Sequence, residues 1–277
     1  MTKIGVLHPG EMGVSIAASA VNNGHQVYWL SQDRGDKTRA RAEKYHLIEI
    51  DSFRQLRRTC ETIISVCPPH AAEEVAKSVI ESGFNGVYLD ANAISPQRAI
   101  KIGQMMKAKD IQFVDGGIIG GPAWTSKETW LYLSGESSQE IASCFSNGPL
   151  ETKIIGSEVG KASALKMCYA AYTKGTTALL SAILATAESL GVREDLYEQW
   201  DMDEKGFSEQ VNRRVGRVTA KAWRFEGEVE EIASTFRQAG LPDGFHLAAA
   251  EVYHLMARFK NACETPPLGE VLAALLA

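Results

Sequence analysis

Residues 156–190 read GSEVGKASALKMCYAAYTKGTTALLSAILATAESL, and this stretch divides the chain into two parts of different character. It holds no proline and is rich in Ala, Leu and Lys, which are strong helix formers, and Ser157 at its start is suited to N-capping. The stretch therefore predicts one long helix over 156–190, about 50 Å in length at roughly 1.5 Å per residue. Gly160 and Gly175 each weaken such a helix by about 1 kcal/mol relative to Ala, which predicts close packing at both positions.

Lys166 is a cation near the start of this helix, on a face shared by Ala162, Tyr169, Ala170 and Thr173. A partly desolvated lysine on a face of small and amphipathic residues can accept and release a proton. A surface lysine that snorkels over apolar neighbours fits the same pattern. Helix geometry alone leaves both interpretations open.

The composition suits two domains with proper cores: 277 residues, of which 45% are hydrophobic and 23% charged. The net charge of −5 provides no basic field for a nucleic acid. The six histidines show no metal-ligand spacing, so we expect no metal site. The apolar run over 175–187 is too short to cross a bilayer and the N-terminus has no secretory pattern, so we expect no membrane partner.

The cysteines indicate a reducing compartment. They are odd in number, scattered and without a CxxC, which predicts reduced, mostly buried thiols of a cytoplasmic protein. The five are Cys60, Cys67, Cys144, Cys168 and Cys263.

The first thirty residues predict a βαβ unit. A strand over 3–7, a helix over 14–22 and a strand over 26–30 flank the turn His8-Pro9-Gly10-Glu11-Met12-Gly13. Glycine turns at a helix N-terminus bind a pyrophosphate through backbone N–H groups and the helix dipole, so we expect this turn to hold a dinucleotide. The fit to GxGxxG is incomplete, because His8 stands at the first glycine position. This side chain either bonds a phosphate or ribose or only fills the turn.

Cofactor choice is determined at the end of the second strand, where NAD enzymes place a carboxylate on the ribose hydroxyls. Ser31 stands there instead, and Arg34 follows with Thr38 or Arg39 in support. A hydroxyl and guanidinium groups satisfy a 2′-phosphate by charge-assisted hydrogen bonds, which favours NADP(H) over NAD(H). Asp33 becomes the ribose acid if the strand ends two residues later, so NAD(H) stays as the alternative.

The strand–helix alternation then repeats. Strands are expected over 61–66, 87–90, 111–114, 130–134 and 153–155, with helices over 71–82 and 96–107 between them. Such alternation predicts an α/β domain with a doubly wound parallel sheet, whose ligands bind at the carboxyl ends of the strands. Three loops meet there: Cys67-Pro68-Pro69, Asn92-Ala93 and Gly117–Pro122. Ordinary turn chemistry also explains the glycines and prolines of each loop.

The remainder of the chain reads as helices, expected over 196–200, 209–223, 228–238 and 242–259. We therefore expect a Rossmann domain over 1–156 and an all-helical domain for substrate binding and dimerisation over 157–277. His246 follows the break at Gly240-Leu241-Pro242 near a helix start, where it is a second candidate for proton transfer.

Five motifs in one order resemble the β-hydroxyacid dehydrogenase and 6-phosphogluconate dehydrogenase-like superfamily: IGVLHPGEMG (4–13), GHQVYWLSQDR (24–34), DANAISP (90–96), DGGIIGG (115–121) and GKASALK (160–166). In that superfamily they are, in turn, the dinucleotide turn, the 2′-phosphate selector, a nicotinamide-side loop, the substrate loop and the helix with the catalytic lysine. The closest likeness is to a little-characterised branch of NAD(P)-dependent oxidoreductases with its own helical C-terminal domain.

The resemblance implies that Lys166 is the catalytic lysine and that Asn92 lies on the nicotinamide side of the pocket. It implies hydride transfer between NADP(H) and a carbonyl or alcohol carbon of a small-molecule substrate, in a homodimer. The substrate loop departs from the superfamily pattern, with Ile119 in place of a serine before Gly120-Gly121.

The helix departs from the pattern too, with Ala170 in place of a carboxamide. Tyr169 or Thr173 is then the replacement donor to the substrate. These losses favour a larger or more apolar substrate, and two alternatives stay open: reduction of a C=N bond, and a non-catalytic NADP(H)-binding sensor of redox state.

Overall fold

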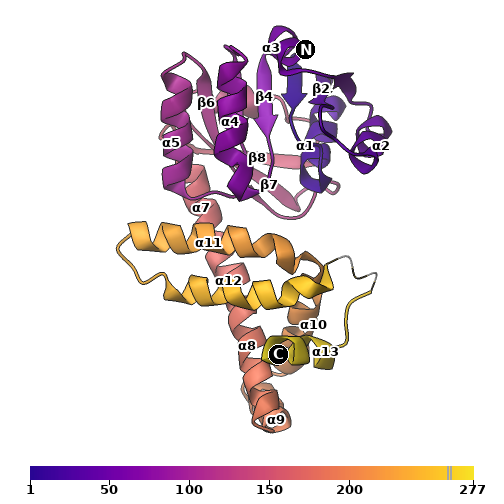
Figure 1. Cartoon of the computed structure of the whole chain (residues 1–277), viewed down its shortest axis with the longest axis vertical. Coiled ribbons are helices and arrows are strands. Elements are labelled where there is room, and N and C mark those ends of the chain that lie inside the picture. The colour runs from indigo at the N-terminus through magenta and orange to yellow at the C-terminus, as the bar shows by residue number, and fades with distance from the viewer. Residues whose placement is uncertain (261, 263) are drawn as a thin grey trace. The chain divides into compact units, whose positions relative to one another are not determined.

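The computed structural model describes the chain except residues 261 and 263, so the predicted thiol of Cys263 lies outside the described residues. The chain divides into two compact units, Met1–Met167 and Cys168–Ala277. The first is an α/β unit and the second is helical (Figure 1). The predicted domain boundary at 156/157 falls before the long helix, whereas this helix packs with the first unit as far as Met167.

The first unit contains one eight-stranded sheet in the order β3-β2-β1-β4-β5-β6-β7-β8. All neighbouring strands are parallel except β6 and β7, which pair antiparallel. The strands are β1 (Lys3–Val6), β2 (Gln26–Leu30), β3 (Ile48–Ile50), β4 (Thr62–Ser65), β5 (Val87–Asp90), β6 (Gln112–Ile119), β7 (Thr129–Ser134) and β8 (Leu150–Gly156). The doubly wound sheet is confirmed, with one antiparallel pair added to it.

Helices cover both faces of this sheet. They are α1 (Glu11–Asn22), α2 (Asp36–Lys44), α3 (Phe53–Thr59), α4 (Ala72–Glu81), α5 (Pro96–Lys107) and α6 (Ser138–Ser143), with the 3-10 turn η1 (Pro69–Ala71) before α4. Alternate strand residues divide between two cores: Ile64 packs with α1 and α6 on one face, whereas Ile63 packs with α3, α4 and α5 on the other. This division explains why the central strands are apolar throughout.

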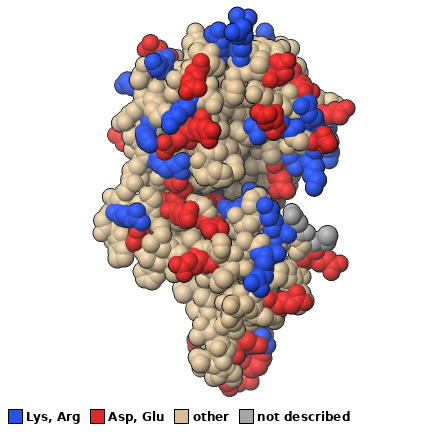
Figure 2. All heavy atoms as spheres, in the orientation of Figure 1, with Lys and Arg blue, Asp and Glu red and all other residues tan. Residues whose placement is uncertain are grey.

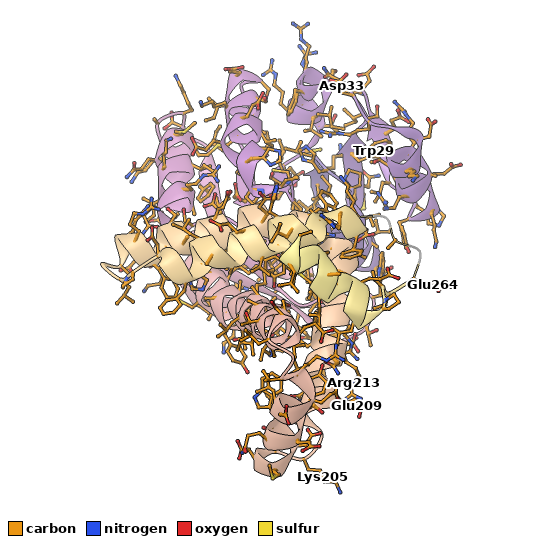
Figure 3. The ribbon with its side chains drawn as sticks, turned by 60° about the horizontal axis from the view of Figure 1, so that its bottom comes forward. Trp29, Asp33, Lys205, Glu209, Arg213 and Glu264 are labelled. Atoms are coloured by element: carbon orange, nitrogen blue, oxygen red, sulfur yellow. The ribbon has the colours of Figure 1, made fainter. Side chains whose placement is uncertain are left out.

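The second unit is built from α8 (Thr176–Ser189), α9 (Arg193–Asp203), α10 (Phe207–Val218), α11 (Ala222–Gln238), α12 (Gly244–Met256) and α13 (Leu268–Leu276), with the 3-10 turns η3 (Thr219–Lys221) and η4 (Ala257–Phe259). Helices α11 and α12 lie side by side along their lengths (Figure 1). On α10, Glu209 and Arg213 form an ion pair one turn apart (Figure 3). Among the described residues, no helix has the length and apolar character needed to span a membrane.

The single helix predicted over 156–190 is corrected in two ways. Residues up to Gly156 belong to β8, Gly160 has φ +100°, and the helix α7 begins only at Lys161, so Ser157 is not its N-cap. A π-helical turn, η2 (Ala171–Gly175), then separates α7 (Lys161–Ala170) from α8.

The predicted packing at the two glycines of this region is confirmed. A Cβ on Gly160 would lie 3.1 Å from the Ile100 side chain, and one on Gly175 would lie 3.1 Å from Nε2 of His246.

Other boundaries also move. Helix α1 begins at Glu11 rather than at residue 14, and the helix predicted over 209–223 ends at Val218 because η3 intervenes before α11. The sequence patterns did not predict α2, β3, α3, α6 and α13.

Candidate functional site

The turn between β1 and α1 is shaped for a bound anion. Gly10 is the N-cap of α1, and its N–H donates to the carbonyl of His8 at 2.8 Å. A Cβ on Gly13 would lie 2.1 Å from that carbonyl oxygen, so only glycine fits there. A Cβ on Gly10 would meet no atom within 4 Å, which leaves open space beside the first turn of α1. N–H groups at a helix start with open space before them suit a pyrophosphate.

The other turn residues differ in exposure. Pro9 is buried and Met12 half-buried, whereas Glu11 is exposed. The imidazole of His8 has a buried Nδ1 with no hydrogen-bond partner in the described structure. Burial, followed by the positive charge of Arg34, lowers the pKa of His8 to about 4, so the ring is neutral at pH 7.

Arg34 lies between the dinucleotide turn and the loop after β4, since its charge acts on both His8 and the Cys67 thiol. Its backbone N–H donates to the carbonyl of Ser31 at 3.1 Å, and its Nε is buried without a hydrogen-bond partner among the described residues. A buried guanidinium N–H that lacks an acceptor fits an incoming phosphate oxygen.

Lys and Arg side chains gather over α2, which follows this strand end (Figure 2). Thr38 is half-buried near the start of α2, and its N–H donates to the carbonyl of Gly35. Asp33, the alternative ribose acid, is exposed in the turn after β2 at φ +59° (Figure 3).

Glu49 on β3 was missed by the sequence analysis. Its carboxylate pairs with Arg39 at 2.5 Å, and the hydroxyl of Ser31 followed by Arg39 lowers the pKa of this carboxyl. Glu49 stands in register with Trp29 on the neighbouring strand, one position before the end of β2. Because β3 is a three-residue strand with no clear pattern of its own, no local sequence signal placed this acid beside Ser31.

Asn92 joins two of the three loops at the strand ends. Its Oδ1 accepts from the Cys67 N–H at 2.6 Å, its Nδ2 donates to the Ser65 hydroxyl at 3.2 Å, and its own N–H donates to Asp90 Oδ1 at 3.0 Å. The side chain is only 3% exposed. These bonds hold the turn after β5 against the end of β4.

The loop after β4 continues from Cys67 into Pro68 and Pro69. Pro68 is exposed, Pro69 begins η1, and the carbonyl of Pro69 accepts from Arg98 at 2.9 Å. Burial raises the pKa of the Cys67 thiol to about 12, so the group is no nucleophile at neutral pH.

Lys166 is half-buried on α7 and lies against the carboxyl-terminal half of β6. A Cβ on Gly117 would lie 3.1 Å from the Lys166 Cβ and 2.6 Å from the carbonyl oxygen of Ala162. Glycine at 117 is therefore what lets α7 approach the strand and brings the lysine to the same sheet edge as the loops after β4 and β5.

Asp115 on β6, directly before Gly116 and Gly117, fixes the start of α7. Its Oδ2 accepts from the N–H groups of Gly160 and Ser163 at 2.9 and 3.0 Å, and its Oδ1 accepts from the Ser163 hydroxyl at 2.5 Å. Burial raises the pKa of this carboxyl, and the bonds from Ser163 oppose that rise. The cap that the sequence analysis assigned to Ser157 is thus supplied by a residue on β6.

The predicted substrate loop leaves the end of β6 and is anchored at several points. Ile119 is half-buried, whereas Gly120 and Gly121 are exposed, with Gly120 at φ +124°. The Thr129 hydroxyl donates to the Gly121 carbonyl at 2.7 Å.

Further along this loop, the N–H of Ala123 donates to the Ser15 hydroxyl on α1 at 2.9 Å. The Trp124 ring stacks on Tyr45, with 4.7 Å between ring centroids.

Tyr169, Thr173 and His246 belong to the second unit. Tyr169 is 47% exposed, and the Thr173 hydroxyl donates to the Tyr169 carbonyl at 3.2 Å. His246 is 6% exposed, its Nδ1 has no hydrogen-bond partner within the described parts of the chain, and burial lowers its pKa. Its ring lies 4.4 Å from that of Phe236, which gives it the surroundings of a packed core side chain.

The described residues hold no cluster of three or more His, Cys, Asp or Glu side chains that suits a metal ion. The four described cysteines are free thiols, of which Cys60 and Cys144 are buried and Cys168 is exposed.

Comparison with known proteins gives two matches to families. Residues 3–145 match the family described as the NAD binding domain of 6-phosphogluconate dehydrogenase, which is more than half of the chain. Residues 187–256 match a domain of unknown function, DUF1932.

Individual proteins are also similar to this chain. An uncharacterised 28.5 kDa protein of Methanothermus fervidus is 30% identical over 83% of this chain and 89% of its own length. The structure of 3-hydroxyisobutyrate dehydrogenase from Mycobacterium tuberculosis, solved with L-serine, is 17% identical over all of both chains, with a TM-score of 0.73. An imine reductase variant from Myxococcus stipitatus, solved with NAD+, is 15% identical over 100% of this chain and 99% of its own, with a TM-score of 0.58.

Proposed function

We propose, because this chain belongs to the family of the NAD binding domain of 6-phosphogluconate dehydrogenase, that it is an NADP(H)-dependent oxidoreductase acting on CH–OH or C=O groups. The observation that carries the proposal is the position of Lys166, brought by Gly117 to the sheet edge at which the dinucleotide turn also opens. A dinucleotide turn and a nearby proton carrier are the two parts that hydride transfer to a carbonyl requires.

The cofactor residues divide by the part of the dinucleotide that they would bind. The N–H groups after Gly10 bind the pyrophosphate, the neutral His8 ring donates or accepts beside it, and the orphaned Nε of Arg34 binds the 2′-phosphate. Ser31 and Thr38 support the phosphate. Asn92 is a positioning residue, because its amide holds the loops after β4 and β5 in place around the nicotinamide side of the pocket.

When bound, the cofactor supplies the hydride at C4 of its nicotinamide ring. Lys166 supplies the other half of the chemistry: as an ammonium group it stabilises and protonates the developing alkoxide, and as an amine it accepts the alcohol proton in the reverse direction. Asp115 keeps the lysine in position through its bonds to the first turn of α7. The loop residues Ile119, Gly120 and Gly121 form the proposed substrate side of the first unit. Tyr169, Thr173 and His246 of the second unit stay sequence-based candidates for substrate binding.

The test is NADP-linked turnover over a panel of hydroxy acids, sugar acids and aryl alcohols with their carbonyl partners, using the wild type and Lys166→Ala. We expect the variant to lose at least about 100-fold in turnover while its NADPH dissociation constant stays unchanged. Lys161→Ala is the matched control, since Lys161 lies on the same helix with its exposed side chain paired to Glu158. Equal turnover in wild type and Lys166→Ala would remove the lysine from the mechanism.

Reduction of a C=N bond is the second candidate, favoured by the structural likeness to an imine reductase and by the apolar residues at 119 and 170. Parallel assays of imines and ketones separate the two reactions. Tight NADPH binding without turnover on either class would instead favour a redox sensor.

We also propose a homodimer, and a cytoplasmic location on the basis of the scattered cysteines.

A further inference from the structure

We infer that Glu49 is a cofactor-discriminating residue, whose carboxylate occupies the polar groups that a 2′-phosphate needs and so lowers the preference for NADP(H) over NAD(H). The inference rests on the proposed dinucleotide site and adds to it a residue that opposes the phosphate. It arises from the contacts that Glu49 makes with Ser31 and Arg39 at the end of β2.

The geometry joins three groups. Arg39 donates through Nη1 to Glu49 and through Nη2 to the carbonyl of Ser31 at 3.4 Å, and the Ser31 side chain lowers the pKa of the same carboxyl. The Arg39 guanidinium also lies 5.8 Å from the centroid of the Trp29 ring. Glu49 therefore pairs with one of the cations that the strand end offers to a phosphate and acts on the Ser31 side chain beside it.

Each cofactor meets this carboxylate differently. A 2′-phosphate brings about two negative charges beside a carboxylate whose lowered pKa keeps it ionised at pH 7, and the two repel each other. It must also displace Glu49 from Ser31 or from Arg39 to use their donors. The 2′-hydroxyl of NAD(H) carries no charge and can donate a hydrogen bond to the same carboxylate.

Arg34 is independent of this arrangement. Its buried Nε has no partner in the part of the chain that the structure describes, and its positive charge lowers the pKa values of His8 and the Cys67 thiol. The guanidinium of Arg34 is therefore available to bind a phosphate, whereas that of Arg39 is paired with Glu49. We expect the wild type to prefer NADP(H) only moderately, with Glu49 as the cause of the moderation.

The experiment measures dissociation constants of NADP+ and NAD+ for the wild type and Glu49→Gln by isothermal titration calorimetry. Glutamine keeps the shape and removes the charge, and the side chain is 52% exposed, so the fold tolerates the change. We expect the ratio of the two dissociation constants to shift about tenfold toward NADP+, and the shift to shrink at 0.5 M NaCl because salt screens exposed charges.

A control removes the same charge elsewhere. Glu43→Gln alters an exposed acid on α2, and we expect it to change the ratio less than twofold. An unchanged ratio in Glu49→Gln, or one that shifts as much in Glu43→Gln, would overturn the inference. A shift toward NAD+ would overturn it too, since Glu49 would then act by orienting Arg39 for the phosphate.

The outcome is separable from that of the proposed function. A wild type that prefers NAD+ contradicts the proposed NADP(H) preference, yet the direction of the Glu49→Gln shift still decides the role of Glu49. Conversely, a strong NADP+ preference that Glu49→Gln leaves unchanged retains the proposed cofactor and rejects the inference.

Discussion

Asp90, at the end of β5, is a buried carboxyl with one partnered and one orphaned oxygen. Its Oδ1 accepts from Asn92, whereas its Oδ2 is buried and has no partner in the described structure. Burial, opposed by the N–H of Asn92 and assisted by the charge of Asp115, raises its pKa to about 7. The folded protein therefore keeps a proton on Asp90 at pH values at which the unfolded chain has lost it.

This shift predicts a stability that depends on pH. Asp90 contributes most to the free energy of unfolding below about pH 4. This contribution falls as the pH rises from about 4 to about 7, by about 4 kcal/mol at most. Asp90→Asn cannot ionise, so we expect it to be more stable than the wild type at pH 8, with an advantage that is less than half as large at pH 5. Urea unfolding at both pH values measures the difference; an equal free-energy difference at pH 5 and pH 8 would contradict it.

At the residue scale, sequence reasoning found what local motifs encode. The glycines of the β1–α1 turn and Arg34 follow from a strand–turn–helix pattern that is read along the chain. Glu49 and Asp115 act on residues far from them in sequence, and only strand register or helix docking brings them to Ser31 and Ser163. A local sequence pattern does not predict contacts between residues far apart in the chain, so these two contacts could be found only in the folded structure.

At the element scale, the proposed substrate loop is held by contacts from α1 and from the residue after α2. The buried bond from the Ala123 N–H to Ser15 ties it to the helix of the dinucleotide turn, and the Trp124–Tyr45 stack ties it to the end of α2. Arg41 of α2 in turn donates to the carbonyl of Pro9 at 3.2 Å. Helix α1 and the α2 region thus contact both this loop and the turn between β1 and α1.

We predict that Trp124→Ala loosens this loop. Aromatic pairs are worth about 0.5–1.5 kcal/mol beyond area burial, so hydrogen exchange at the Ala123 amide should become up to about tenfold faster. Ser126→Ala is the control, because Ser126 is exposed on the same loop and its side chain makes no hydrogen bond to the described residues. If both variants exchange alike at Ala123, the stack does not anchor the loop.

The long helix marks the limit of pattern reading at this scale. Composition predicted it over 156–190, yet its start depends on the side chain of Asp115 and its interruption at 171–175 on packing in the second unit. There the carbonyls of Thr173 and Lys174 accept from Arg214 at 2.8 Å and from Tyr253 at 2.9 Å. Helix propensities do not contain these tertiary partners.

At the scale of the whole molecule, fold class and the presence of two units were accessible from the sequence because strand–helix alternation stops before residue 193. The antiparallel β6–β7 pair and the short elements α2, β3 and α3 were not, since each is decided by its neighbours in the sheet. The polar helix α2 has a single buried residue, Ala42, and thus no apolar periodicity to detect.

The second unit presents apolar side chains that its own core does not use. Leu179 on α8 and Leu190 at its C-cap are 58% and 70% exposed, and they share one helix face because a spacing of eleven residues is close to three turns. Tyr172, in the π-helical turn before α8, is 68% exposed. Exposed apolar stripes of this kind are typical of association surfaces. A second copy of the chain is the partner that the proposed homodimer supplies.

We predict that Leu179→Glu converts this dimer into monomer, because it buries a charge at the centre of the stripe. Size-exclusion chromatography with light scattering at several protein concentrations measures the mass directly, against 30.2 kDa for one chain. Met202→Glu is the matched control: Met202 is 73% exposed on α9, outside the stripe, and should leave the mass unchanged. A wild type of monomer mass at high concentration would rule out the dimer, and a Leu179→Glu variant that stays dimeric would place the contact on another face.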